Sequence, residues 1–216
     1  MILSYFINYF FKTTKIFKEN DNELLFKNGI YDLHNGTFRE DHKQQIMMLD
    51  YNYDPHVNDV RVSNFLSDIL PDENIRRFFL KSISNLLSGE NKEDSLIIIV
   101  ARNATIRTLF IQMFHKTFGK YSNGQRVHII DEDDDIRLVV KKKTIITCSS
   151  FDKFYTIIPK ERKRIVIPFT TNCSSQAFPL FDTNEISIKQ SFMNILLQYY
   201  HSEDSTMPNL ISILSQ

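Results

Sequence analysis

The stretch "IIIVARNATIRTLF", residues 97–110, indicates the fold of the larger part of this chain. Four consecutive apolar residues are typical of a strand buried on both faces of a parallel sheet. A short polar turn follows them. The next segment, "TLFIQMFHKTFG" at 108–119, has apolar residues at helical spacing and a glycine at its end. The stretch therefore predicts a strand that leads through a tight turn into a helix.

The rest of the C-terminal half repeats this alternation. Apolar runs at 95–100, 126–131, 142–150 and 163–169 predict four buried strands, and residues 187–201 predict a further helix. Strands that alternate with helices are expected in α/β domains with a parallel sheet. We therefore place an α/β core at residues 93–216.

A different pattern precedes the core. Residues 23–40 predict a β-hairpin with a tight turn at Asn35-Gly36, and residues 46–53 predict an extended segment. Two helices are expected at 61–70 and 74–87, the second beginning after Pro71-Asp72 and ending at Gly89. We treat residues 23–92 as a hairpin and helical subdomain, and residues 1–22 as an apolar helix that packs on the domain or on a partner chain.

Composition excludes several classes of protein. The 216 residues carry 26 Lys plus Arg and 26 Asp plus Glu, so a globally basic nucleic-acid binder is not expected. This composition is still compatible with a local basic groove. Cys148 and Cys173 lack a nearby histidine pair and do not predict a zinc site. No signal peptide is expected, and no apolar run reaches the roughly 20 residues of a membrane span. We expect a soluble intracellular protein.

The turn after the first core strand has the spacing of a phosphate-binding loop. In G-x-x-x-x-G-K-[ST], glycines allow main-chain N–H groups to approach a phosphate closely. Here the eight positions read "ARNATIRT", with Ala101, Ile106 and Arg107 in place of the two glycines and the lysine. Asn103 lies within the turn, and Thr108 keeps the hydroxyl that could bind Mg²⁺. The sequence predicts a degenerate loop, closed sterically by the β-branched Ile106.

An acidic segment, "VHIIDEDDD", follows the second core strand. In one interpretation Asp131 and Glu132 hold Mg²⁺ and activate water, with Thr108 and Asp131 as the metal ligands. In the other, the five consecutive acidic residues are a solvated loop. The sequence favours neither.

Polar and basic residues near strand ends are further candidates. Thr147, Ser149 and Asn172 are either polar sensors of a bound ligand or caps of their own loops. Three consecutive lysines either contact nucleic-acid phosphates or are solvated. They are Lys141, Lys142 and Lys143.

The order of these segments resembles a known family. "FKNGIYDLHNGTFRE", "LDYNYDP", "FLSDIL" and "RRFFLKSISNLLSGE", followed by "LIIIV", "FIQMFHKTFG", "TIITCSS" and "KERKRIVIPF", resemble the primase-helicases of poxviruses, giant DNA viruses and related phages and plasmids. The resemblance covers roughly residues 23–172 and includes Asn28-Gly29, which opens the region. It implies a superfamily 3 helicase with an AAA+-like core, preceded by a small hairpin and helical subdomain.

The resemblance also implies site roles. ATP and Mg²⁺ would be the cofactors of an active member, and Arg162 or Arg164 would reach the nucleotide of a neighbouring subunit in a homo-oligomer; a solvated basic turn is the alternative. Only fourteen residues separate Glu132 from Thr147. In the family, the corresponding stretch carries the hairpin that grips single-stranded DNA.

Three functions follow from these observations. The favoured one is a viral DNA-replication protein at a site in the host cytoplasm, with weak or lost ATP hydrolysis, no bound cofactor, and a role as a partner of DNA or replication proteins. The second is an active, divergent NTPase subunit. The third is a non-enzymatic scaffold that assembles through its N-terminal helix.

Overall fold

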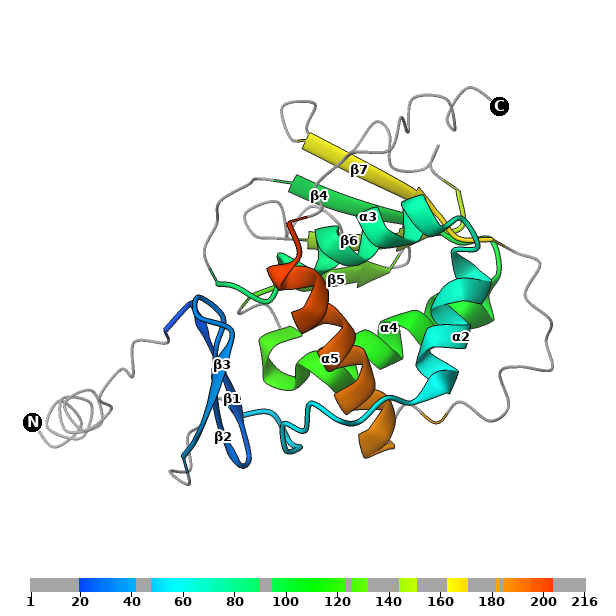
Figure 1. Cartoon of the computed structure of the whole chain (residues 1–216). Helices are drawn as coiled ribbons and strands as arrows, with labels where there is room; N and C mark the ends of the chain where they lie inside the picture. The colour runs from blue at the N-terminus through cyan, green and yellow to red at the C-terminus, as the bar shows by residue number, and fades with distance from the viewer. Residues whose placement is uncertain are drawn as a thin grey trace, which may run out of the picture.

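The computed structural model describes residues 20–41, 48–89, 95–122, 126–131, 144–150, 163–170, 182 and 185–203. Two sheets and a layer of helices make up this part of the chain (Figure 1). The elements in chain order are β1 (Glu23–Phe26), β2 (Gly29–Asp32), β3 (Thr37–Glu40), α2 (Val60–Ile69), α3 (Glu73–Ser84), β4 (Ser95–Val100), α4 (Ala104–Phe118), the short 3-10 helix η1 (Gly119–Ser122), β5 (His128–Asp131), β6 (Thr144–Cys148), β7 (Lys163–Pro168) and α5 (Ile186–His201). The predicted α/β class is confirmed.

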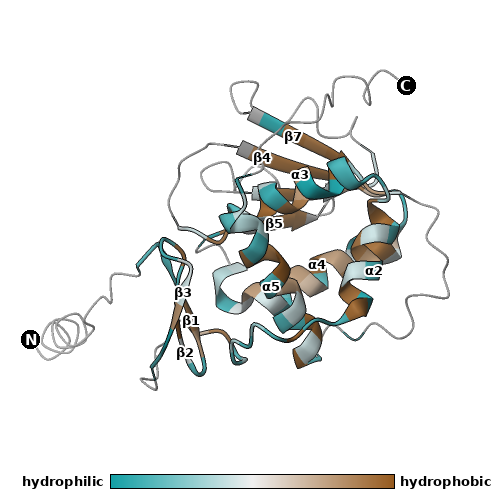
Figure 2. Cartoon of the chain, in the orientation of Figure 1, coloured by the Kyte–Doolittle hydropathy of each residue, from teal (hydrophilic) through white to brown (hydrophobic). Residues whose placement is uncertain are grey.

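The larger sheet is parallel and has the strand order β5-β6-β4-β7. Successive side chains of a strand point to opposite faces. Ile97 and Ile99 of β4 join the main core, which includes residues of all four helices, whereas Leu96 and Ile98 join a second buried cluster. Both faces are therefore apolar, which explains the unbroken hydrophobic run and the brown strands in Figure 2.

The helices lie on the face of the sheet that carries Ile97 and Ile99 (Figure 1). Short polar side chains cap the starts of three of them: Asp59 caps α2, Asn103 caps α4, and Asp72 caps α3 by accepting from two main-chain N–H groups at 2.8 and 3.1 Å. The ammonium group of Lys81 caps the C-terminal end of α5. It donates to the main-chain carbonyls of Tyr199 and Tyr200 in the last turn and of the C-cap Ser202, at 3.0, 2.9 and 2.7 Å.

The smaller sheet has three antiparallel strands in the order β1-β2-β3. The predicted hairpin with its turn at Asn35-Gly36 corresponds to β2 and β3, and β1 is an additional strand. Asn28-Gly29 makes an additional turn between β1 and β2. A Cβ on Gly29 would lie 2.2 Å from the carbonyl oxygen of Arg39, so only glycine fits there. The predicted turn at Asn35-Gly36 is confirmed, with φ of 66° at the glycine.

Asn28 also ties the sheet to the following segment. Its Nδ2 donates to the carbonyl of Tyr53 at 2.9 Å, and its Oδ1 accepts from the N–H of the same residue at 2.8 Å. Residues 48–53, expected to be extended, form no assigned strand, although the N–H of Leu49 donates to the carbonyl of Leu25 in β1 at 2.7 Å. The segment therefore runs beside β1.

Arg126 and Tyr121 join the smaller sheet to the core. The guanidinium of Arg126 donates to the main-chain carbonyls of Leu87, Asn20 and Glu23, and lies 4.4 Å above the ring of Tyr121. The hydroxyl of Tyr121 accepts from the N–H of a β1 residue at 3.1 Å. Both side chains are buried, so this junction lies within the folded interior.

Gly89 has a different role from the one predicted. Helix α3 ends at Ser84, five residues earlier, and the N–H of Gly89 donates to the carbonyl of Asp21 at 2.8 Å. A Cβ at this position would lie 2.1 Å from the Asp21 carboxylate. Gly89 permits close approach to the chain that precedes β1. The predicted N-terminal helix and the proposed boundary near residue 92 lie outside the described residues, apart from residues 20–22.

No helix in the described ranges has the length and apolar character needed to cross a membrane.

Candidate functional site at the turn after β4

The turn after β4 contains only Ala101, Arg102 and Asn103, because α4 begins at Ala104. Neighbouring strands hold it on both sides. The N–H of Ala101 donates to the carbonyl of Cys148, the last residue of β6, at 2.8 Å. On the other side, the carbonyl of Val100 accepts from the N–H of Phe169, the residue after β7, also at 2.8 Å. The turn lies at the carboxyl edge of the sheet, where α/β proteins usually bind ligands.

Asn103 is the N-cap of α4. Its Oδ1 accepts from the N–H groups of Thr105 at 2.9 Å and Ile106 at 3.4 Å, and its carbonyl accepts from the N–H of Arg107 at 3.2 Å. These are the N–H groups that a helix start otherwise offers to an anion. The predicted helix start at residue 108 is thus four residues late, although an asparagine before an apolar helical pattern is a start signal.

Ile106 does not close the turn in the expected way. Its side chain is fully buried in the main core, on the inner face of α4. The physical reason is helical periodicity: because the helix already includes residues 104–107, Ile106 points toward the sheet with Phe110. The four positions 104–107, which the motif spacing assigned to the degenerate loop, are the first turn of a helix.

The side chain of Arg107 folds back onto the turn after β4. Its Nη1 donates to the carbonyl of Ala101 at 3.2 Å, and only 8% of the residue is exposed. In contrast, Thr108 is exposed on the outer surface of α4, one full turn into the helix. The arginine and threonine of the motif therefore lie on different faces of the helix.

The structure brings two other candidates together. Asp131, the last residue of β5, is in register with Thr147 of β6, and Thr147 is in register with Ile99 of β4. These residues form one row across the carboxyl edge of the sheet. Thr147 is buried, and Ser149 follows the end of β6 at the same edge. Of Asp131, only the main-chain position is described.

Arg164 lies toward the opposite edge. It is in register with Leu96, near the start of β4, whereas the row of Asp131 and Thr147 includes Ile99. Three residues of strand separate the two rows, or about 10 Å at 3.3 Å per residue. Within one subunit Arg164 is therefore not grouped with the other candidates.

The remaining candidates lie outside the described residues. They are Glu132, Lys141, Lys142, Lys143, Arg162 and Asn172. Within the described ranges, no three His, Cys, Asp or Glu side chains are grouped so that they could hold a metal ion.

Comparison with known proteins gives two viral relatives, each named "Putative helicase". This chain is 26% identical over 138 residues to one from Acanthamoeba polyphaga mimivirus, a match that covers 61% of this chain and 13% of that protein. It is 28% identical over 109 residues to one from Invertebrate iridescent virus 3, covering 47% and 12%. No family model matches the chain. The chain is therefore related to viral proteins with helicase names, and the matched segments cover about an eighth of the length of those proteins.

Proposed function

We propose that this chain is a helicase-like module of a DNA virus that has lost its triphosphate site and acts as a binding or structural partner in DNA replication. The resemblance to primase-helicases and the two viral relatives support the helicase-like relationship. The capped start of α4 supports the loss of the triphosphate site, and it is the observation on which the proposal depends.

A phosphate loop works because several N–H groups without other acceptors converge on one anion. Here the N–H groups of Ala101, Thr105, Ile106 and Arg107 have protein acceptors. Within the described part of the turn, only those of Arg102, Asn103 and Ala104 have none. A triphosphate would have to displace the Asn103 side chain, whose cap contributes about 0.5–2 kcal/mol to helix stability.

Arg107 adds a second obstacle. A lysine in a phosphate loop reaches the β- and γ-phosphates as a compact charge on a flexible stem. The Arg107 guanidinium is instead buried and bonded to the Ala101 carbonyl. Its exposure to a ligand would require that contact to break.

The test is calorimetric titration of MgATP into the wild-type chain and an Arg107→Ala variant, together with a phosphate-release assay. We expect no binding heat from either protein and no turnover above the buffer blank. An Asp131→Asn variant is the control for contaminating ATPases. Turnover that is present in the wild type and lost in Asp131→Asn would refute the proposal.

A second function is favoured by the row of Asp131 and Thr147 next to β4. An active NTPase would place an acidic metal ligand and a polar sensor at this edge. It would use ATP with Mg²⁺ held by Asp131, since Thr108 lies on the outer surface of α4, and Arg162 or Arg164 of a neighbouring subunit would act on the nucleotide. Nucleotide-dependent assembly, measured by light scattering, would support this function over the first.

A further inference from the structure

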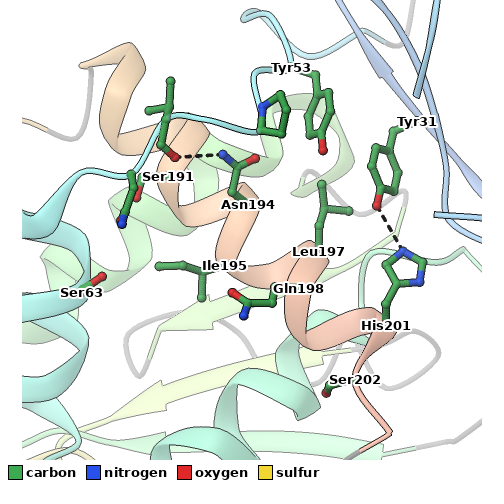
Figure 3. A pocket seen from close by; sticks show the side chains of 13 residues that line it. Tyr31, Tyr53, Ser63, Ser191, Asn194, Ile195, Leu197, Gln198, His201 and Ser202 are labelled. Atoms are coloured by element: carbon green, nitrogen blue, oxygen red, sulfur yellow. Dashed lines mark hydrogen bonds between the residues drawn. The ribbon is translucent and has the colours of Figure 1, made fainter. Parts of the chain in front are cut away.

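A cleft of about 670 Å³ opens between α5, the segment before α2 and Tyr31 of β2 in the smaller sheet (Figure 3). Its volume is within the range of small-molecule sites, about 300–1,000 Å³, and its position between two structural units is a common one for such sites. No residue of the β4–α4 turn lines it. The cleft is therefore independent of the turn on which the proposed function depends.

The lining contains no Asp, Glu, Lys or Arg. Two amide side chains of α5 supply hydrogen-bonding groups. Asn194 uses both hydrogens of its Nδ2 to donate to the carbonyls of Asp54 at 2.8 Å and Val57 at 2.9 Å. This fixes the amide, and its Oδ1 accepts no hydrogen bond from the described residues. Gln198, one turn further along α5, is exposed and makes no hydrogen bond within the described part of the chain.

Tyr53 forms an aromatic wall. Its ring packs at 4.8 Å from Phe38 and 5.2 Å from Tyr31, measured between centroids, so neighbouring rings restrict its rotation. Figure 3 shows its hydroxyl directed toward α5. Burial raises the pKa of Tyr53, which keeps this hydroxyl a donor at neutral pH. Ile195 and Leu197 contribute the apolar surface opposite.

At one end of the cleft, the hydroxyl of Tyr31 and Nε2 of His201 are 3.2 Å apart and hydrogen-bonded. Burial raises the pKa of Tyr31 to about 12, and burial followed by the nearby Lys81 charge lowers the pKa of His201. Both groups are therefore uncharged at neutral pH. The contact links β2 to the last turn of α5 and holds this end of the cleft in place.

We infer that this cleft binds an uncharged heteroaromatic ring of the nucleobase kind, either in a free nucleoside or as an unstacked base of single-stranded nucleic acid. A phosphate would find no cation in the lining. A purely apolar ligand would cover the Oδ1 of Asn194 without bonding it, which is unfavourable. A nucleobase offers a flat face to Tyr53 and donors and acceptors at its edge for Asn194 and Gln198.

The experiment uses the full chain with methyl-labelled Ile and Leu. Adenosine, guanosine, cytidine and thymidine are titrated separately, then a single-stranded ten-nucleotide DNA and an abasic strand of the same length. We expect at least one nucleoside, or the base-containing strand alone, to shift the methyl signals of Ile195 and Leu197. The abasic strand separates recognition of bases from recognition of the phosphate backbone.

Two variants test the location. Gln198→Ala removes an edge contact and should weaken binding about fivefold or more. Ser63→Phe fills the cleft from α2 and should abolish binding. Gln112→Ala is the matched control, because Gln112 is an exposed glutamine of α4 outside the cleft. Circular dichroism checks that each variant is folded.

Nucleoside binding weakened by Gln198→Ala and abolished by Ser63→Phe supports the inference with free nucleosides as the ligand. If only the base-containing strand binds, and the two variants affect its binding in the same way, the inference is supported with single-stranded nucleic acid as the ligand. No binding, equal binding of the abasic strand, or binding unaffected by both variants overturns it. None of these outcomes depends on whether MgATP binds at the β4–α4 turn.

Discussion

Replacing Arg126 by methionine should destabilise the whole fold, although Arg126 lies in neither candidate site. The side chain is 4% exposed and donates to the carbonyls of Leu87, Asn20 and Glu23. Leu87 follows the end of α3, Asn20 precedes β1, and Glu23 is the first residue of β1. Methionine has a similar length but no hydrogen-bond donor. It would fill the same space and leave these carbonyls without the hydrogen bonds from the guanidinium.

The magnitude follows from the number of lost interactions. A hydrogen bond to a charged group contributes about 1.5–3 kcal/mol, and the contact with Tyr121 adds about 0.5–2 kcal/mol. The Asn20 carbonyl is near the surface and can bond to water instead. Because such terms are not additive, we expect a loss of about 3–5 kcal/mol in the free energy of unfolding, comparable with breaking a buried ion pair.

Urea unfolding followed by circular dichroism measures this loss. With a slope of about 1–3 kcal/mol per molar urea, the midpoint should fall by at least about 1 M. Arg39→Met is the matched control: Arg39 pairs with Glu23 at 2.9 Å in the same sheet, but its side chain is 60% exposed. We expect the control to lose less than about 1 kcal/mol. Equal effects of the two variants would refute the reasoning.

Three further variants test individual contacts. Asn103→Ala removes the cap of α4 and should lower the free energy of unfolding by about 0.5–2 kcal/mol, whereas Asn103→Asp should keep most of it; equal losses in urea titrations would contradict the assigned cap. Tyr51→Phe removes a buried hydroxyl that donates to an α4 carbonyl at 2.7 Å, so we expect a loss of about 1–3 kcal/mol, against little change for Tyr200→Phe. Hydrogen bonds from Arg61 lower the pKa of Asp59 from its ordinary value of 3.8 to about 2. The stability that this carboxylate contributes is present above 3.8 and lost as pH falls toward 2, so Asp59→Asn should flatten the acid-induced loss of stability in that interval; an unchanged acid titration would count against the contact.

Local sequence patterns predicted most elements of the fold. The four strands of the larger sheet were found because each is an apolar run, and α2, α3 and α5 because their apolar residues recur at helical spacing. The smaller sheet was less predictable. Asn28-Gly29 resembled part of a strand, yet it makes a turn whose glycine is required by contact with β3.

The candidate site was only partly predictable. The motif spacing places the candidate at the turn after β4 and extends that turn to Arg107, whereas α4 already begins at Ala104. Asn103 is the N-cap of α4, and a capping residue is a local signal that the glycine-rich motif does not take into account. No sequence motif marks the cleft of Tyr53, Asn194 and Gln198. Its two sides, the segment around Tyr53 and helix α5, are about 140 positions apart in the sequence.

The sequence by itself determined the α/β class and the alternation of strands and helices, since hydrophobic periodicity acts over a few neighbouring positions. Only the tertiary structure decided strand order, the third strand of the smaller sheet, the burial of Ile106 and Arg107, and the position of the Arg126 junction. Each of these depends on contacts between residues far apart in the chain, whose free energies exist only when the whole core has formed.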